Sequence, residues 1–434
     1  MEAPDSPQPA AVAGTAPPVA SGARRFLRGA LGSGLAVGAR TAGALLLNKL
    51  LAVYGGPGGL TLLAHFQNLM ALFTTLPNEG THVGLVKYLA PLRAGSGRYR
   101  AWLGAGLLLN GLALLLGTVV LVAGRQALVS IFAPSLTWVA LFAAGIGLLT
   151  ANTFWVAVLL AAGRLRAYVW LTVVLSAVGV GGVGAALYAG LPVENVLLAY
   201  LLAQGATLLP TLGLCARYGL LPPLRGRLSR GAARDLGRFL LMAVSVLVFS
   251  KAVDFVMRDV LIRYFSLYQT GLWQAVAKLS DNYTMVFSAV MGSVFYPRLS
   301  ALIGQPGPLR RYVRTVLLVL APGAALGLGL LYLVRDWLLP LLFDAQFGAA
   351  RDLLAPQFIG DWAKFLTWTL LFLLMAQARV GRYVAVQAGS AVLYAGLLAV
   401  LLPRYGLLGA PLAHAARFGI LLLGCLMYFR PYWR

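Results

Sequence analysis

The chain has 434 residues, of which 60% are hydrophobic and only 11% are charged, and its formal net charge is +23. This composition excludes a soluble globular domain of this size. Repeated apolar runs of about 20 residues indicate a multi-span helical membrane protein instead, and they leave no long polar insert for a soluble catalytic domain.

The N-terminal region predicts a tail followed by two spans. Residues 1–23 are rich in proline and alanine and lack an apolar core, which favours a disordered tail over a signal peptide. The first span is expected at about Gly29–Val53, and the second runs from about Leu60 toward Lys87 after a glycine-rich turn at 54–59. Further spans are expected at about 102–123, 137–161, 168–190, 195–215, 239–265, 271–296, 312–334, 353–376, 384–402 and 410–429.

These spans number about twelve, and most loop arginines and lysines fall on one side of them. The positive-inside rule therefore places both termini in the cytoplasm, together with the long basic loop Ala216–Arg238, and it accounts for the positive charge without nucleic-acid binding. That loop separates a first lobe, residues 24–215, from a second lobe, residues 239–434. Weak similarity between the lobes, such as AAGRLRAYV at 161–169 and AQARVGRYV at 376–384, indicates a parallel repeat. We therefore expect an all-α integral membrane protein with two six-helix bundles, related by a pseudo-two-fold axis, around a central cleft.

Charged residues occur inside the two spans between 239 and 296, where each costs at least ~2.5–3.5 kcal/mol at mid-membrane depth. Helical spacing places them on one face of each span. They are Lys251, Asp254 and Arg258 in the first of these spans, and Lys278 and Asp281, with Gln274, in the second. Two interpretations are open: internal ion pairs that only join helices, or a solvated cavity that binds a charged ligand.

Polar stripes also occur in four other predicted spans. They are formed by Arg40 and Asn48; by His65, Asn68, Thr75, Glu79 and His82; by Gln357, Asp361 and Lys364; and by His414 and Arg417. In any one span, hydrogen bonding between helices explains such a pattern as well as function does. Taken together, the stripes favour a polar central cavity, and their slight basic excess suits an anionic ligand such as a phosphate or diphosphate.

The candidate site residues divide into two sets. The candidate substrate-binding residues of the cavity are Arg40, Lys251, Arg258, Lys278, Lys364, Arg417, Gln274 and Gln357. The candidates for ion coupling are Glu79, Asp254, Asp281 and Asp361. The sequence contains no phosphate-binding loop, no metal-ligand cluster and no nucleophile–base pair, so we expect no catalytic residue, metal or cofactor. Cys215 and Cys425 lie in or at the edge of apolar runs and suit neither a metal site nor a disulfide framework.

Four stretches carry a resemblance to a known family. They lie at 48–69, 84–91, 271–283 and 341–364, and two of them contain the longest patterns. The residues that fit these patterns are Gly271, Trp273, Gln274, Ser280, Asp281 and Tyr283, and Phe347, Arg351, Asp352, Leu353, Gln357, Gly360, Asp361 and Lys364. On these motifs the chain resembles the polysaccharide-transporter branch of the multidrug/oligosaccharidyl-lipid/polysaccharide (MOP) flippase superfamily. Within that branch it is most similar to the O-antigen translocases and the lipid III flippases.

The resemblance implies a flippase of the bacterial inner membrane that works by alternating access. Its substrate would be an oligosaccharide linked through diphosphate to undecaprenol, in the biosynthesis of lipopolysaccharide or a related surface polysaccharide. A polysaccharide polymerase and a chain-length regulator are candidate partners beside the lipid bilayer. Arg40 and Arg258 fall where the family carries basic cavity residues, whereas Lys251 and Asp254 match no family motif and rest on spacing alone.

Two other functions are weighed against this one. A cation-coupled multidrug exporter of the same superfamily would favour acids over bases in its cavity. A membrane polymerase or ligase would need a large periplasmic loop with catalytic groups, whereas the longest such loop, about Arg335–Asp352, carries only three acids, Asp336, Asp344 and Asp352.

Overall fold

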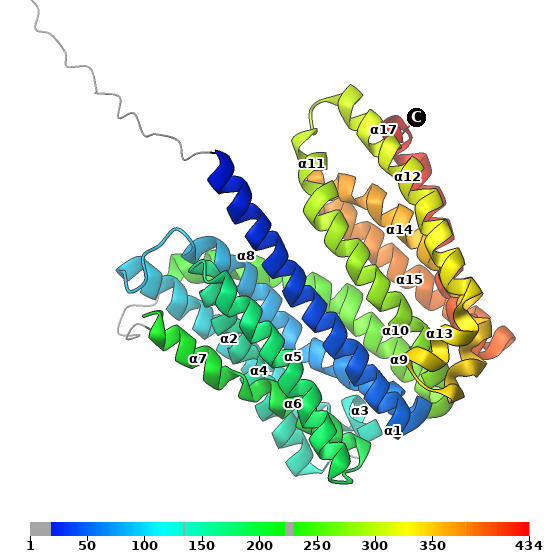
Figure 1. Cartoon of the computed structure of the whole chain (residues 1–434), viewed down its shortest axis with the longest axis horizontal. Coiled ribbons are helices and arrows are strands. Elements are labelled where there is room, and N and C mark those ends of the chain that lie inside the picture. The colour runs from blue at the N-terminus through cyan, green and yellow to red at the C-terminus, as the bar shows by residue number, and fades with distance from the viewer. Residues whose placement is uncertain (1–18, 133–134, 222–228, 378, 434) are drawn as a thin grey trace, which may run out of the picture.

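The computed structural model describes residues 19–132, 135–221, 229–377 and 379–433. These residues form helices and short connections without any β-strand, which confirms the predicted all-α class. Two helical lobes meet at one end and diverge at the other (Figure 1). When α1 is counted as two spans, the described residues provide the twelve long helical segments that the sequence predicts.

The first lobe is built on α1, Val19–Leu89, which contains the first two predicted spans. Gly56, at the predicted glycine-rich turn, has a φ of 59° and kinks this helix. Glycine adopts such a left-handed conformation without the steric cost of a Cβ. The remaining elements of this lobe are α2 (Gly97–Ala123), α3 (Arg125–Leu128), η1 (Ser130–Phe132), α4 (Leu136–Ala161), α5 (Leu165–Tyr188), α6 (Val193–Ala206) and α7 (Leu208–Arg217).

The seventh span joins the two lobes. It consists of α8 (Arg230–Val246), the π-helical turn η2 (Leu247–Ala252) and α9 (Val253–Tyr264). Its first part packs on α1 and α2 of the first lobe, where Ala232 and Leu236 are buried against Ala105. Its last part lies against α1 and α10. The predicted linker 216–238 therefore ends within α8, and its residues 222–228 lie outside the described ranges.

The second lobe follows the same plan of packed antiparallel spans. Its elements are α10 (Leu267–Val290), η3 (Met291–Phe295), α11 (Tyr296–Ala301), α12 (Pro306–Leu333), α13 (Arg335–Leu342), η4 (Ala345–Leu353), α14 (Leu354–Ala376), α15 (Val380–Tyr405), η5 (Gly406–Leu408), α16 (Gly409–Tyr428) and α17 (Arg430–Trp433). Within the described ranges, seven helical segments are long and apolar enough to cross a membrane by length and composition. Outside that set, α9 is only 12 residues long, and α10 carries a charged stripe that lowers its hydropathy.

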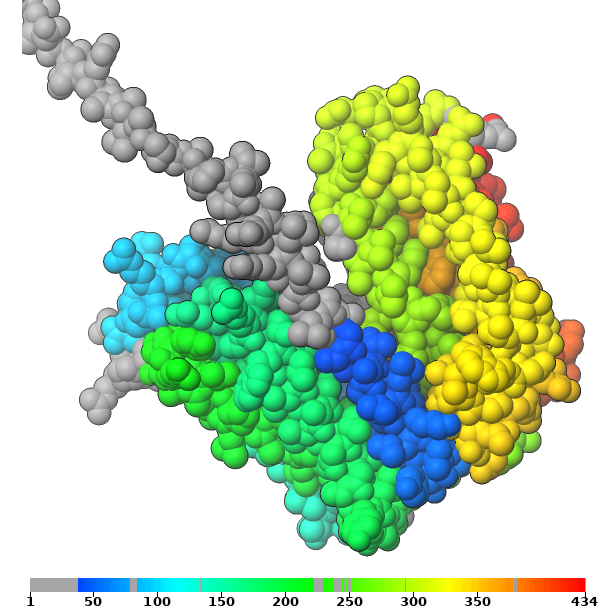
Figure 2. All heavy atoms as spheres, viewed as in Figure 1, coloured from blue at the N-terminus to red at the C-terminus, as the bar shows by residue number. Residues whose placement is uncertain are grey.

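The hydrophobic cores show which end of the molecule is closed. At the end that contains Gly56, one continuous core includes Phe66 of the first lobe and Trp273 and Phe347 of the second. At the other end each lobe has a core of its own, around Leu103 in the first lobe and around Leu299 in the second. The space-filling view shows the lobes in contact at one end and apart at the other (Figure 2).

The open end is the basic end of the molecule. The separate core of the first lobe adjoins the loop with Arg93, and that of the second lobe adjoins the segment with Arg310 and Arg311. The positive-inside rule predicts that this side faces the cytoplasm. On that prediction the cleft between the lobes is open to the inside in this conformation.

Candidate functional site

Arg258 of α9 lies at the junction between the lobes. Its side chain is 7% exposed. Its Nε donates to Oε1 of Gln274 on α10 at 2.8 Å, and a terminal nitrogen donates to the carbonyl oxygen of Ala64 on α1 at 3.2 Å. Its guanidinium also lies 5.9 Å from the ring centre of Trp273. One charged side chain therefore connects the seventh and eighth spans to the first lobe, without a carboxylate among its hydrogen-bond partners.

Lys278 makes a second contact between the lobes one turn further along α10. Its Nζ donates to Oε1 of Gln67 on α1 at 2.5 Å. Gln67 and Ala64 are three residues apart on α1, so the two basic side chains contact neighbouring positions of the same helix. Gln274 lies between them in sequence and is fully buried.

The predicted cavity residues nearest to these contacts have different environments. Asp254 and Asp281 are exposed, and Lys251 of η2 is half-buried. Within the described part of the chain, none of the three takes part in an ion pair. A charged group at this depth is stable without a partner only where water reaches it. These side chains therefore fit the solvated-cavity interpretation of the stripe better than the ion-pair interpretation.

Asp361 of α14 has the opposite environment, because it is fully buried within the second lobe. Its Oδ1 accepts from Lys364 at 2.5 Å and contacts Nε2 of His414 at 3.0 Å. Its Oδ2 accepts from Ser280 at 2.7 Å, from Gln357 at 3.2 Å and from the hydroxyl of Tyr283.

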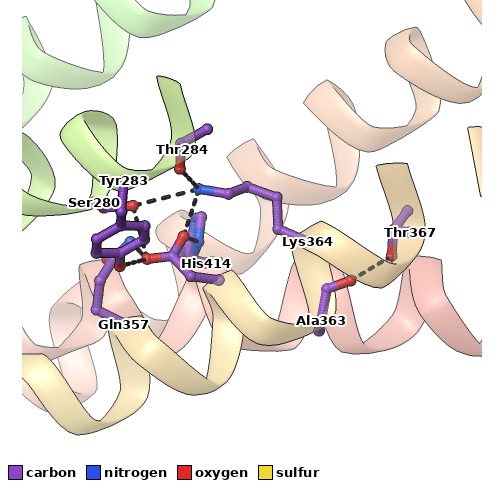
Figure 3. Close-up of polar contacts among 9 residues, drawn as sticks. Ser280, Tyr283, Thr284, Gln357, Ala363, Lys364, Thr367 and His414 are labelled. Carbon is purple, nitrogen blue, oxygen red and sulfur yellow. Dashed lines mark hydrogen bonds and ion pairs between the residues drawn. The ribbon is translucent and has the colours of Figure 1, made fainter. Parts of the chain in front are cut away.

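This cluster of polar groups is the Asp361 network (Figure 3). Lys364 extends it by donating to Thr284 at 2.9 Å and to Ser280 at 3.3 Å. The network joins α10, α14 and α16, and its residues Lys364 and Gln357 are 6% and 5% exposed. Here the interpretation of polar residues as connections between helices accounts for the arrangement.

Arg417 of α16 is half-buried and lies against α15. Its Nε donates to the hydroxyl of Ser390 at 2.6 Å, and its guanidinium lies 4.9 Å from the ring centre of Tyr394. It also interacts electrostatically with Asp254 of α9.

The first lobe contributes fewer described site residues. Arg40 is exposed on α1, as expected for a group in an open cleft. The side chains of Glu79 and His82 lie outside the described residues. His65 is 1% exposed and its ring stacks 4.6 Å from that of Phe255 on α9, so it packs the junction between the lobes.

At the closed end of the cleft, side chains of α1 donate hydrogen bonds to backbone carbonyls of the second lobe. Lys49 on α1 donates to the carbonyl oxygens of Pro340 and Leu341 at 3.2 and 3.1 Å. Thr61 donates to the carbonyl oxygen of Leu267 at 2.8 Å. These contacts use α1 on one side and the start of α10 and the α13 region on the other.

Sequence reasoning missed the partners of the predicted residues. Gln67, Ser390 and Tyr394 contact Lys278 and Arg417, but none was predicted as a site residue. Gln67 offered a signal, because it lies in the motif stretch 48–69 on a span with other polar residues. Among the described residues, no group of three or more His, Cys, Asp or Glu side chains is arranged to hold a metal ion.

Comparison with solved structures identifies the fold. The inward-closed conformation of lipid II flippase MurJ has a TM-score of 0.69 at 12% identity and covers 92% of this chain and 87% of its own. An inward-facing multidrug resistance MATE transporter of the MOP superfamily has a TM-score of 0.71 at 14% identity, with 90% and 93% covered. An outward-facing conformation of such a transporter has a TM-score of 0.62 at 13% identity, with 91% and 94% covered. The chain therefore has the fold of the MOP transporters.

Sequence comparison adds particular relatives. The chain is 28% identical over 390 residues to "Lipid III flippase" of Escherichia coli (strain K12), which covers 86% of this chain and 91% of that protein. The protein of the same name from Shigella flexneri matches with the same values. No family model matches the sequence. These relatives confirm the resemblance predicted from the four motifs, and all are transporters or flippases and not enzymes.

Proposed function

We propose that the protein is a flippase that moves a lipid-linked oligosaccharide across the bacterial inner membrane. The observation that carries this proposal is the match to the lipid III flippases over 91% of their length, which includes both lobes and the junction between them. More specifically, we propose that the substrate is an undecaprenyl-diphosphate-linked repeat unit of the O-antigen or enterobacterial-common-antigen type. We propose transport from the cytoplasmic to the periplasmic leaflet, with both termini in the cytoplasm.

The basic groups of the cleft would bind the diphosphate. Arg40 is exposed and Lys251 and Arg417 are half-buried, and a guanidinium or ammonium group binds phosphate oxygens through charge-assisted hydrogen bonds. The acids Asp254 and Asp281 lie on the same faces of α9 and α10. They suit the hydroxyl groups of a sugar, which donate hydrogen bonds to carboxylates.

Arg258 and Lys278 supply a means of coupling the ligand to the lobe movement. Both donate to oxygens of α1 while the far end of the cleft is closed. Opening that end would separate α1 from α9 and α10 and remove these acceptors. Because an unpaired buried charge is costly, the open state needs substitute acceptors, and the diphosphate oxygens would provide them. A bound substrate would thereby shift the equilibrium toward the outward-open state. The size of the shift is set by the difference between its binding free energies for the outward-open and inward-open conformations.

A cation-coupled multidrug exporter is the alternative function. The observation that favours it is the pair of exposed carboxylates, Asp254 and Asp281, since an acid without an ion-pair partner is suited to a cationic drug or a coupling ion. The relatives at 28% identity favour the lipid substrate instead. A polysaccharide polymerase and a chain-length regulator remain proposed partners of the flippase.

The deciding experiment uses the full-length protein in proteoliposomes. Undecaprenyl-diphosphate-linked disaccharide with a fluorescent label is placed in both leaflets, and its movement is followed by quenching from outside. We expect translocation that depends on the protein, and no effect of cationic dyes as competitors. Transport of cationic dyes without movement of the lipid-linked sugar would overturn the proposal in favour of the drug exporter.

A further inference from the structure

A large apolar cavity lies on the flank of the second lobe, between the seventh and eleventh spans. It has a volume of about 540 Å³ and is lined by η2, α9 and α15. Its walls include Val256 and Val260 on one side and Leu398 on the other, and its polar lining groups are the hydroxyls of Tyr264 and Tyr394. We call this cavity the flank groove. The polar contacts of the cleft described above do not explain it.

The flank groove and the charged cleft share one helix as a wall. Val256 and Val260 line the groove, whereas Asp254 and Arg258 belong to the charged stripe. Residues two apart on an α-helix are about 200° apart around its axis, so the two sets lie on opposite faces of α9. The π-helical turn η2 separates the same two environments, with Ala252 in the groove and Lys251 in the stripe. Such turns are rare and often mark functional sites.

The inner boundary of the groove connects it with the charges of the cleft. Tyr394 lines the groove and is only 6% exposed. The guanidinium of Arg417 lies 4.9 Å from the ring centre of Tyr394 and interacts electrostatically with Asp254. An anionic group bound at Arg417 would therefore lie only a few bond lengths from the groove.

The groove is long enough for a hydrocarbon chain and exceeds the thickness of one leaflet. Its lining residues on the seventh span run from Val248 to Tyr264, which at 1.5 Å per residue is about 24 Å. Half of the hydrocarbon core of a bilayer is about 15 Å thick. Measured along the seventh span, the groove begins at the closed end of the cleft and is long enough to extend past the middle of the bilayer.

We propose that the flank groove binds the polyprenyl chain of the transported lipid while the diphosphate occupies the cleft beside Arg417. This inference rests on the proposed function and names the place of the substrate's hydrocarbon part. An ordinary lipid that enters the groove merely exchanges one apolar environment for another. A chain attached to a head group held in the cleft has a high effective concentration at the groove, because its binding is intramolecular. The groove therefore selects the chain of the bound substrate over bulk lipid.

A second cavity in the same lobe provides a matched control. It lies between α12 and α14, has a volume of about 320 Å³ and is lined by residues such as Ala325, Gly329 and Phe358. Its lining contains no charged residue. Ala325 and Ala395 are both exposed alanines on helices of the second lobe, one in each cavity, so equivalent substitutions can be compared.

The first test is photolabelling of the full-length protein in proteoliposomes. One probe is undecaprenyl diphosphate with a diazirine on its chain, and the reference probe is a phosphatidylethanolamine with a diazirine on its acyl chain. We expect the polyprenyl probe to label the α9 and α15 segments of the flank groove in clear preference to the control cavity, and the phospholipid probe to label both. If the two probes label the two cavities in the same ratio, the groove holds bulk lipid and the inference is wrong.

The second test separates the groove from the proposed function. Binding of undecaprenyl diphosphate and of isopentenyl diphosphate, which has the head group and a single isoprene unit, is measured for Ala395→Trp and Ala325→Trp. We expect Ala395→Trp to weaken binding of the long-chain ligand about tenfold, to leave that of the short-chain ligand unchanged, and Ala325→Trp to change neither. Equal effects of the two variants would overturn the inference about the groove. Failure of the unmodified protein to bind either diphosphate would instead overturn the proposed function.

Discussion

Gly271, at the start of α10, approaches the backbone of Pro57 so closely that a Cβ at position 271 would lie 2.0 Å from the Pro57 carbonyl oxygen. Pro57 follows the kink at Gly56 in α1, so this contact joins the two lobes at the closed end of the cleft. Backbone atoms on both sides leave no flexible side chain to move away. The closed end therefore depends on the absence of a side chain at residue 271.

Gly271→Ala should prevent this end from closing. The added methyl group overlaps the Pro57 carbonyl, so the lobes must separate there, and we expect the outward-open conformation to be favoured and transport to be strongly reduced. The measurement is the labelling rate of a cysteine introduced at Thr61, in a background without Cys215 and Cys425, by a membrane-impermeant maleimide from the periplasmic side. Gly292→Ala is the matched control, because a Cβ there meets nothing within 4 Å. Unchanged labelling and transport in Gly271→Ala would contradict this role.

Arg258→Ala should abolish transport of the lipid-linked sugar while the protein still reaches the membrane. The change removes the donors to Gln274 and Ala64 and, in our proposal, a charge-assisted contact with the diphosphate. Hydrogen bonds to charged groups contribute about 1.5–3 kcal/mol each, so a loss of one corresponds to at least about tenfold in rate or affinity. Arg258→Lys keeps the charge and should retain part of the activity.

The control for Arg258 is on the same helix. Arg263 pairs with Asp259 one turn away at 2.8 Å, and its side chain is 62% exposed. Exposed pairs of this kind contribute little, so Arg263→Ala should leave transport nearly unchanged. Normal export by Arg258→Ala would count decisively against a diphosphate site at this residue.

Lys364→Met should destabilise the second lobe. Asp361 is fully buried, and Lys364 is its positively charged partner at 2.5 Å. Removing one partner of a buried ion pair leaves an uncompensated charge, which costs about 3–5 kcal/mol. The double variant Asp361→Asn/Lys364→Met removes both charges and should recover part of this loss. The measurement is thermal unfolding of the purified protein in detergent; equal losses for the single and double variants would show that the pair is not energetically coupled.

The driving force of transport is predicted to be the membrane potential. A diphosphate diester carries about two negative charges, and moving each through 100 mV is worth ~2.3 kcal/mol, so outward movement gains about 4–5 kcal/mol. Transport should therefore occur in proteoliposomes with an imposed potential and no pH gradient. Proton antiport is the alternative. It would be indicated if transport required a pH gradient and if Asp281→Asn, at an exposed carboxylate, or Asp361→Asn, at a buried one, removed the response to that gradient.

The predicted orientation can be tested with single cysteines at the two ends of the first lobe. Leu221 is 38% exposed in the basic connection after α7, and Tyr188 is 96% exposed at the opposite end of α5. In a background without Cys215 and Cys425, an impermeant maleimide should label Leu221→Cys only from the cytoplasmic side and Tyr188→Cys only from the periplasmic side. The reverse pattern would invert the topology and the direction of the cleft.

The sequence by itself determined the elements of this protein and the faces of its helices. Apolar runs of bilayer length predict the twelve spans because backbone groups in lipid must be satisfied within a helix. The spacing of Lys251, Asp254 and Arg258 placed them on one face because that relation depends only on helical periodicity. The kink at Gly56 followed from a local glycine-rich turn. Each of these inferences uses residues that are close in the chain.

Only the tertiary structure decided which of these faces meet. Asp361 and Lys364 form a stripe like that of Asp254 and Arg258, yet the first pair is enclosed in one lobe, and the second adjoins the contact between α9 and α1. Spacing cannot distinguish these environments, because the rotation of a helix and its neighbours depend on packing with helices distant in sequence. In a membrane this packing is little guided by hydropathy, since lipid chains are as apolar as the helix faces. Packing between spans also determines which side chains pair. Lys278 thereby contacts Gln67, and Arg417 lies against Tyr394.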